Sequence, residues 1–362
     1  MEMKTIVYFF LTLILLFSCT KKKDLELHFL DEYVVEDSLV VKTTLIGGLS
    51  GIDYDDGNYF FVVDDPKKPR FLKAKIVLQK NKIISVDFQN MTILKDATSS
   101  FYKENVLDLE SIFIDKETKE INFVSEGSIN TGKSPSIFST DKNGKLIHVY
   151  ELPKSLKNNQ KIKHNAVFEG SSKSSNHKGF WVSVEGPLKG DGEDPSFTKA
   201  SSPIRMTYFD KTTKKAIKQF AYQLEHIVKP SKGDVNLNGV TALTEYKENH
   251  FFIVERTYQS GYGSYGNIVK IFEASIDKTT TNILEIDSLR NTKYTPLKKR
   301  LLFNFDTIKN KLTNGIIDNI EGITLGPLLA NGNQSLILVS DNNFQTYGRQ
   351  LNQFILLEIS TK

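Results

Sequence analysis

The sequence predicts an all-β protein and, within that class, a β-propeller. Three observations lead to this prediction. A two-part unit occurs five times along the 362 residues, each unit has the pattern of an antiparallel hairpin, and further strand-like runs lie between the units. Hairpins repeated in this way are typical of sheets arranged radially around a central axis.

The repeated unit consists of a short first piece and an apolar second piece. The first piece has an apolar residue, a polar residue and usually a glycine, and the second piece ends in charged residues. The clearest copy is Asn-Ile-Glu-Gly-Ile at 319–323 followed by the run at 336–344. The other copies pair 49–52 with 59–65, 109–112 with 121–127, 168–170 with 180–186, and 237–240 with 251–256.

Turn-forming residues separate the two pieces of most units. Asp-Asp-Gly-Asn occupies residues 55–58, and Asn-Gly-Asn occupies residues 331–333. Such residues adopt the positive φ angles that tight hairpins need. Each unit is therefore predicted to be a β-hairpin.

The number of blades follows less directly from the sequence. The units start 59 to 83 residues apart, further than the ~40–50 residues of a simple four-stranded blade. Alternating runs such as 71–78, 83–88 and 268–272 can supply outer strands. Residues 284–317 do not repeat, and they could be a sixth, degenerate blade or an insertion. Six blades are therefore favoured, and five or seven remain possible. Residues 39–45 and 353–359 are expected to be the first and last strands of the propeller, and their pairing would close the ring.

The first 38 residues are expected to lie outside the propeller. Residues 5–18 are apolar, and this run is too short for a ~20-residue membrane span, so residues 1–18 are predicted to be a signal peptide. Leu-Phe-Ser-Cys at 16–19 resembles a bacterial lipobox, which predicts acylation of Cys19, although an ordinary secretory signal remains the alternative. Residues 19–38 would be a tether and 39–362 the propeller domain. The expected location is a membrane-anchored, extracytoplasmic lipoprotein.

Composition excludes some classes of partner. The formal net charge is only +4 and the lysines are scattered among acids, so the sequence has no nucleic-acid-binding footprint. Cys19 is the single cysteine, which rules out an intramolecular disulfide. A monomer is expected.

Aligning the five units places charged and polar residues at equivalent positions. The first pieces align Ser50, Glu110, Glu169, Asn238 and Glu321, and the second pieces align Asp65, Glu126, Glu185, Arg256 and Asp341, with Asp64 and Glu255 beside them. Equivalent positions in a propeller form a ring near the axis, where carboxylates repel one another unless a cation neutralises them. Carboxylate oxygens suit Ca²⁺, with Mg²⁺ also possible. The structural alternative is that the acids only tie neighbouring blades together.

These positions suggest a metal-assisted hydrolysis. The expected metal ligands are Glu110, Glu169, Glu321, Asn238 and Asp65; the expected catalytic residues are Glu321, Asp341, Arg256 and Glu255; and the expected substrate-binding residues are Arg70, Arg205, Asn342 and Asn343. A divalent ion would polarise the ester, and arginine would offset the developing charge. Gly-x-Ser-x-Gly, His-Glu-x-x-His and P-loop motifs are absent from the sequence.

Several short motifs together resemble one family. They are Asp-Asp at 64–65 with Arg70, Glu-Gly-Pro-Leu at 185–188, Val-Glu-Arg at 254–256, Glu-Gly-Ile at 321–323, Gly-Pro at 326–327 and the run at 336–344. In this order they resemble the bacterial phytase-like family, described as "esterase-like activity of phytase", over residues 45–359. Ser111 departs from the usual glycine of the second unit. The resemblance implies an extracytoplasmic propeller that hydrolyses phosphate or carboxylic esters.

Two other functions remain open from the sequence. One is a lactonase-like propeller enzyme, which would also place Glu, Asn and Asp around a divalent ion. The other is a non-catalytic propeller that binds a ligand or a partner, for which the tyrosine-rich loop at 258–265 would supply contacts.

Overall fold

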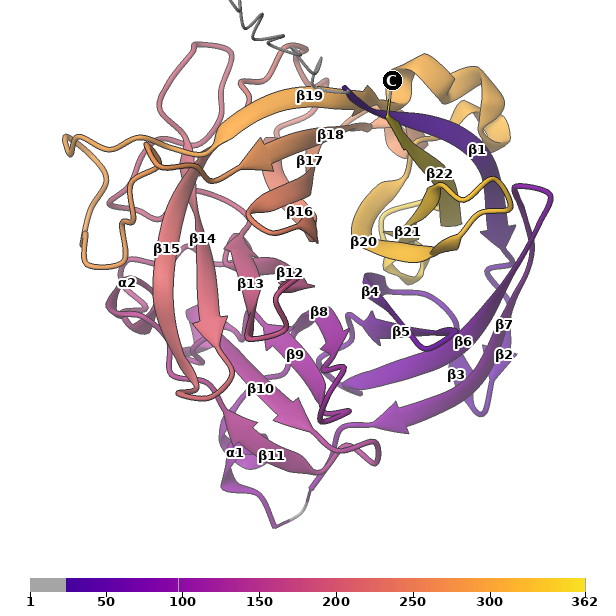
Figure 1. The fold of residues 1–362 in the computed structure, drawn as a ribbon, viewed down its shortest axis with the longest axis horizontal. Helices are drawn as coiled ribbons and strands as arrows, with labels where there is room; N and C mark the ends of the chain where they lie inside the picture. Colours follow the sequence, from indigo (N-terminus) through magenta and orange to yellow (C-terminus); the bar gives the residue numbers. More distant parts are fainter. Residues whose placement is uncertain (1–23, 97, 362) are drawn as a thin grey trace, which may run out of the picture.

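Five four-stranded antiparallel sheets surround a central axis in the computed structural model, which describes residues 24–96 and 98–361 (Figure 1). The first three sheets are β4 (Leu49–Asp55), β5 (Asn58–Val63), β6 (Arg70–Gln79) and β7 (Lys82–Ile93); β8 (Leu109–Ile114), β9 (Ile121–Ser125), β10 (Ser136–Thr140) and β11 (Leu146–Val149); and β12 (Phe168–Lys173), β13 (Gly179–Val184), β14 (Pro203–Asp210) and β15 (Lys215–Gln223). The fourth is β16 (Asn236–Lys247), β17 (His250–Gln259), β18 (Asn267–Ser275) and β19 (Lys298–Asn304), and the fifth is β20 (Asn319–Leu328), β21 (Gln334–Asp341), β22 (Asn352–Thr361) and β1 (Leu25–Val35). The all-β propeller is therefore confirmed, with five blades.

Helical segments and one small sheet occupy the connections. They are β2 (Val40–Val41) paired with β3 (Thr44–Leu45), the short helices α1 (Ser100–Glu104) and α2 (Lys154–Lys157), and the 3₁₀ turns η1 (Ile129–Thr131), η2 (Gly263–Tyr265), η3 (Phe305–Lys311), η4 (Thr313–Gly315) and η5 (Asn343–Gln345). No helix in the described ranges is long and apolar enough to cross a membrane.

The favoured count of six blades is wrong, because residues 284–317 do not form a sheet of their own. This stretch contains β19, which completes the fourth blade, and the turns η3 and η4. The loop before β19 packs along the third blade, where the Ile283 N–H donates to the Gln219 carbonyl at 2.7 Å and the Leu297 N–H donates to the Ala221 carbonyl at 2.8 Å. The long spacing between the fourth and fifth units thus reflects an insertion.

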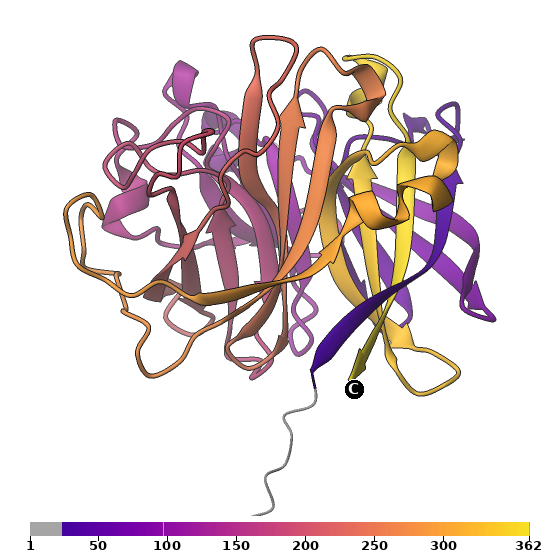
Figure 2. The ribbon, with the colours of Figure 1, turned by 90° about the horizontal axis from the view of Figure 1, so that it is seen from above.

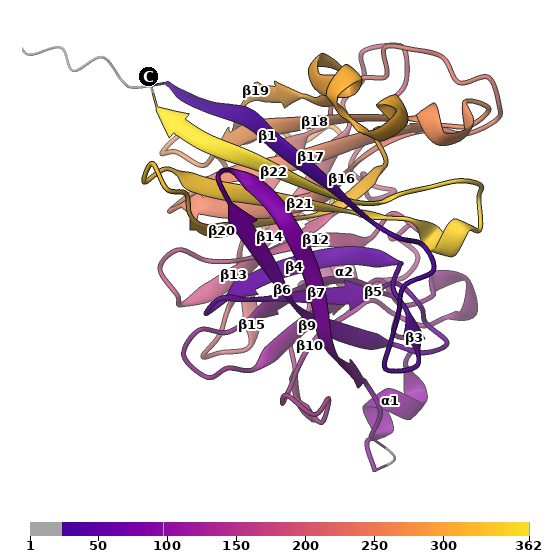
Figure 3. The same ribbon diagram turned by 90° about the vertical axis from the view of Figure 1, so that its right-hand side faces the viewer.

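The two ends of the chain close the ring in the fifth blade. Strand β1 pairs antiparallel with β22 from Leu25 opposite Thr361 to Val35 opposite Asn352 (Figure 3). The expected closure by the chain ends is observed, but residues 25–35 form the strand rather than part of a tether, and 40–41 pair only with β3. Strand β1 is the outermost strand of its blade, so most of its residues are half-exposed, and a register shift interrupts its pairing after Phe29. The alternation of apolar and polar residues along β1 is therefore weak in the sequence.

The predicted hairpins are all present, and a left-handed residue lies in each turn. Gly57 has φ 72°, and Lys119, His177, Asn249 and Gly332 take positive φ in the other four hairpins. These turns share one end of the propeller, where β1 begins beside the last strand's end (Figure 2). The starts of the innermost strands lie at the opposite end.

Apolar side chains between neighbouring blades form the core. Strand β13 is buried along its whole length, and the ring of Phe180 contacts that of Phe113 in the second blade with centroids 4.7 Å apart. Burying one such side chain contributes roughly 1.5–3 kcal/mol. Near the axis a Cβ on Gly170 would lie 2.8 Å from the Leu243 nitrogen, so glycine allows adjacent innermost strands to approach closely.

Candidate active site

Each innermost strand carries one bulged residue near its start. The register with the second strand shifts at Ser50, Glu110, Glu169–Gly170, Thr241 and Glu321. A bulge re-aims side chains and often lies beside a functional site. Arg256 pairs with Gly239 and Asp341 pairs with Asn319, each two residues before the bulge. Asp64, Glu126 and Glu185 directly follow Val63, Ser125 and Val184, the last paired residues of their strands.

The observed register corrects two positions of the sequence alignment. In the fourth blade the bulge is at Thr241, whose hydroxyl donates to the Ile320 carbonyl at 2.7 Å as the Ser50 hydroxyl donates to the Leu109 carbonyl at 2.8 Å. Asn238 is thus three residues from the ring position. In the first blade Asp64, rather than Asp65, takes the place of Asp341.

A cavity of about 420 Å³ lies at the end of the channel where the innermost strands begin, and three of the bulged residues, Glu110, Glu169 and Glu321, line it. Nine carboxyl groups and two arginines line it: Asp64, Asp108, Glu110, Glu126, Glu169, Glu185, Asp318, Glu321 and Asp341, with Arg256 and Arg349. Leu237, Tyr258, Tyr347 and Asn343 are also in the lining. The cavity is therefore strongly acidic.

One group of carboxylates has the spacing of a metal site. Single oxygen atoms of Asp64, Asp108 and Glu110 all lie within 4.8 Å of one another. Two oxygens bound to one Ca²⁺ at ~2.3–2.6 Å can be up to ~5 Å apart, so these donors fit a common ion. Burial, a hydrogen bond with Asp108 and repulsion by other acids raise the pKa of Asp64 to about 10, and burial with repulsion by Glu169 raises the pKa of Glu110.

Arg256 neutralises a second group. Its Nη2 atom lies 3.5 Å from Glu185 Oε1 and 3.6 Å from Glu321 Oε1, and its Nη1 donates to Asn319 Oδ1. Asn319 in turn donates to Glu321 at 2.8 Å. Burial raises the pKa of Glu321 to about 7 against the lowering effect of Arg256. Glu321 can therefore gain or lose a proton near neutral pH.

Two further acids have a buried oxygen without a partner. They are Glu126 Oε2 and Glu169 Oε2, in side chains that are 4% and 8% exposed. Burial and repulsion by Asp108 raise the pKa of Glu126 to about 8, and burial with repulsion by Glu185 raises the pKa of Glu169. Asp341 differs, because it accepts the Asn343 N–H at 2.6 Å.

Several expected site residues do not line this cavity. Glu255 accepts from Tyr222 at 2.6 Å, Lys299 at 2.6 Å and Asn238 at 2.9 Å, a saturated network that explains both Glu255 and Asn238 structurally. Asn342 accepts the Gly48 N–H at 3.1 Å and so joins the fifth blade to the first.

Two expected substrate-binding arginines are also structural. Arg70 bonds Asp65 at 2.6 Å. Arg205 is fully buried, forms a bidentate pair with Asp191 at 2.6 and 2.8 Å, and donates to the Ile286 carbonyl at 2.9 Å, which holds the inserted loop.

The structure brings together Glu110, Glu169, Glu321, Asp341, Arg256 and Asn343 from the expected sets and adds others. Glu126 and Glu185 are at positions that the sequence alignment of the five units brought together, and Asp64 is next to a third such residue, Asp65. Asp108 and Asp318 had no repeated signal. Each stands shortly before a bulge, which only the strand register shows. Cys19 lies outside the described residues.

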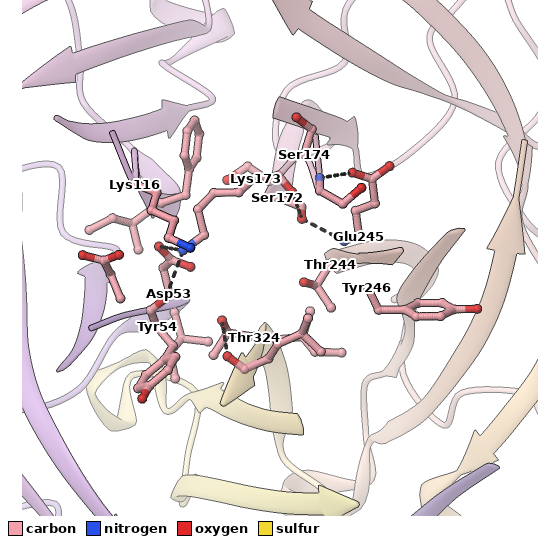
Figure 4. A pocket seen from close by; sticks show the side chains of 18 of the residues that line it. Asp53, Tyr54, Lys116, Ser172, Lys173, Ser174, Thr244, Glu245, Tyr246 and Thr324 are labelled. Carbon is pink, nitrogen blue, oxygen red and sulfur yellow. Dashed lines mark hydrogen bonds and ion pairs between the residues drawn. The ribbon is translucent and has the colours of Figure 1, made fainter. Parts of the chain in front are cut away.

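The other end of the channel has internally paired polar groups. Lys173 donates to Asp53 at 2.8 Å, and Glu245 accepts the Ser175 N–H at 2.6 Å (Figure 4). Glu245 also accepts the Asn249 N–H at 2.7 Å. Ser172 Oγ accepts the Glu245 N–H at 2.8 Å. The Lys173–Asp53 pair joins the third blade to the first, and the contacts of Glu245 with Ser175 and Ser172 join the third blade to the fourth. Because its polar groups are paired in this way, this cavity of about 360 Å³ is the weaker candidate.

Comparison with known proteins gives one family and several similar folds. Residues 44–344 match the family described as "Phytase-like: Esterase-like activity of phytase". No curated protein matches the chain.

Similar solved structures include an exo-β-1,3-galactanase from Phanerochaete chrysosporium (11% identity, TM-score 0.44, 90% of this chain and 63% of that chain). Others are the allergen Mala s 1 of Malassezia sympodialis (12%, 0.43, 90% and 82%) and the tail fibre of Staphylococcus aureus phage P68 (12%, 0.42, 92% and 52%). This chain thus spans less than two thirds of the galactanase and the tail fibre, and the similarities concern the fold alone.

Proposed function

Because the chain belongs to the phytase-like family, we propose that it is a divalent-cation-assisted hydrolase of phosphate or carboxylic esters that acts in the acidic cavity. The observation that carries the proposal is the clustering of Asp64, Asp108 and Glu110 within 4.8 Å at the wall of a cavity of ligand size. Without a cation, the surplus of carboxylates would repel an anionic ester.

The carboxylates of Asp64, Asp108 and Glu110 would hold the ion, and Ca²⁺ suits their oxygen donors, with Mg²⁺ as the alternative. When bound, such an ion polarises an ester oxygen and lowers the pKa of water. Both effects favour attack by water on the ester.

Arg256 and Glu321 supply the remaining functions. The acids around Arg256 raise its pKa, so its guanidinium stays cationic and can offset charge that develops on the ester. Burial raises the pKa of Glu321 to about 7, so its carboxylate can take a proton from the attacking water. In this mechanism water attacks the ester directly, and Glu321 is the general base.

The test measures hydrolysis and metal binding separately. The wild type is assayed with 4-nitrophenyl phosphate, 4-nitrophenyl acetate and a γ-lactone, each with Ca²⁺, with Mg²⁺ and with chelator. We expect metal-dependent hydrolysis of one of the two esters and a kcat about 10²–10⁴-fold lower for Glu321→Gln, with a cooperative unfolding transition that shows the variant is folded. Turnover of the lactone alone would identify a lactonase instead. No turnover of any substrate, with no thermal stabilisation by a divalent ion, would refute the proposal and leave a binding protein.

We further propose that Cys19 is acylated and anchors the protein on the extracytoplasmic side of a membrane. The lone cysteine at the end of an apolar run supports this.

A further inference from the structure

The acids of the cavity fall into three groups by their partners. Asp64, Asp108 and Glu110 have the spacing of one ion, and Arg256 serves Glu185 and Glu321. Arg256 also attracts Glu169 but lies in no ion pair with it or with Glu126, and each of these two acids keeps one buried oxygen without a hydrogen-bond partner. A buried carboxyl oxygen that lacks a partner is costly, so these two atoms indicate a hydrogen-bond donor that the described residues do not supply.

The geometry favours an organic cation over a second small ion. Among the described residues, Asp64, Asp108 and Glu110 are the one group of three or more acids whose oxygens all lie within 4.8 Å of one another, and neither Glu126 nor Glu169 is in it. An ammonium group is larger than Ca²⁺ and binds at longer distances, so it tolerates carboxylates that are further apart.

The mouth of the same cavity suits the substituents of such a cation. Leu237 and Tyr258 face each other across β16 and β17, and both line the cavity with Tyr347. Leu237 is 54% exposed and Tyr347 is 77% exposed, so both side chains are accessible to a ligand that enters the cavity. Tyrosine rings attract alkylammonium groups through their π faces. The Ser264 hydroxyl donates to the Arg349 carbonyl at 2.5 Å, which joins the two loops at this mouth.

We propose that Glu126 and Glu169 bind an ammonium group of the substrate, with Tyr258, Tyr347 and Leu237 contacting its alkyl substituents. The substrate class is then an ester of an amino alcohol. The inference rests on the proposed function in one respect: it treats the bound cation as part of the substrate. Binding of the cation itself does not require the protein to be an enzyme.

A binding experiment tests the inference without catalysis. Choline is titrated into the protein at saturating Ca²⁺, by calorimetry and by thermal unfolding, beside 3,3-dimethylbutanol, which has the same shape without the charge. We expect choline to bind and 3,3-dimethylbutanol not to bind. Glu169→Gln should weaken the binding of choline at least about tenfold. Glu285→Gln, at an exposed glutamate, is the matched control and should bind like the wild type.

Three results would overturn the inference. They are equal binding of choline and the neutral alcohol, unchanged binding by both Glu169→Gln and Glu126→Gln, and loss of choline binding when Ca²⁺ saturates, which would show that metal occupies the pair. The variants should fold, because each substitution removes a repelled charge from a buried cluster.

Hydrolysis adds an independent comparison. If the protein is a phosphatase, phosphocholine should have a KM at least about tenfold below that of 3,3-dimethylbutyl phosphate, and Glu169→Gln should remove the difference. Choline binding that depends on Glu169, without any hydrolysis, would keep the cation site and refute the hydrolase. Metal-dependent hydrolysis with no preference between the two esters would keep the hydrolase and refute the cation site.

Discussion

The metal-free protein should lose stability as the pH rises, and Glu126→Gln should remove part of that loss. Folding raises the pKa of Glu126 from 4.5 to about 8. The folded carboxyl thus keeps its proton to higher pH than the unfolded one, and its contribution to stability is present below about pH 4.5 and is lost as the pH rises to about 8. Glutamine cannot ionise, so the variant should become more stable than the wild type as the pH rises over this range.

The difference between the two pKa values sets the size of the effect. At 1.36 kcal/mol per pH unit, full ionisation corresponds to about 5 kcal/mol, and the low exposure of the side chain leaves little screening by solvent. Neighbouring acids can take up protons together, so Glu126→Gln should raise the free energy of unfolding by about 2–5 kcal/mol at pH 8. At pH 4.5 the gain should be close to zero.

Urea unfolding in the presence of chelator measures the free energy of unfolding at pH 4.5, 6.5 and 8. Glu285→Gln is again the control and should show no gain that grows with pH. A Glu126→Gln variant whose gain does not depend on pH, or that is less stable than the wild type at pH 8, would refute the reasoning about the acidic cavity.

Four further outcomes are expected. Asp108→Asn should weaken Ca²⁺ binding by about tenfold or more, measured by calorimetry, and unchanged affinity would remove this residue from the metal site. Arg205→Ala should lower the free energy of unfolding by about 3–5 kcal/mol, because it leaves Asp191 buried without its partner, while the KM of the folded fraction stays the same. A chain that starts at residue 36 should unfold at a markedly lower temperature than one that starts at residue 24, since it lacks β1; similar melting temperatures would contradict closure by this strand. Cys19→Ser should abolish lipid labelling and move the protein to the soluble fraction.

The hairpins could be predicted because each combines apolar alternation with a turn that needs a left-handed residue. The blade count could not, because the inserted loop before β19 lengthens one spacing without adding a sheet. Strand β1 was also hidden, since an outer strand that is half-exposed on both faces loses its period-two pattern.

Some residues of the candidate site could also be predicted from the sequence, and others could not. The acids at the bulges could be found because they recur at one point of a repeated motif. Arg205 was misassigned because a buried ion pair and a substrate clamp have the same sequence signature, and only the contact with Asp191 separates them. Asp108 lies two residues before the recurring position, which Glu110 occupies, and its role depends on distances across the cavity.

The position of the first strand has a consequence for how the protein would meet a membrane. Leu25 lies at the hairpin end of the propeller, opposite the acidic cavity. It follows Cys19 by six residues, which span at most about 20 Å even when extended. An acyl group on Cys19 would therefore hold the hairpin end against the bilayer and turn the cavity outward. In that orientation the head groups of the surrounding lipids could not enter the cavity, and the protein would draw its esters from the aqueous phase.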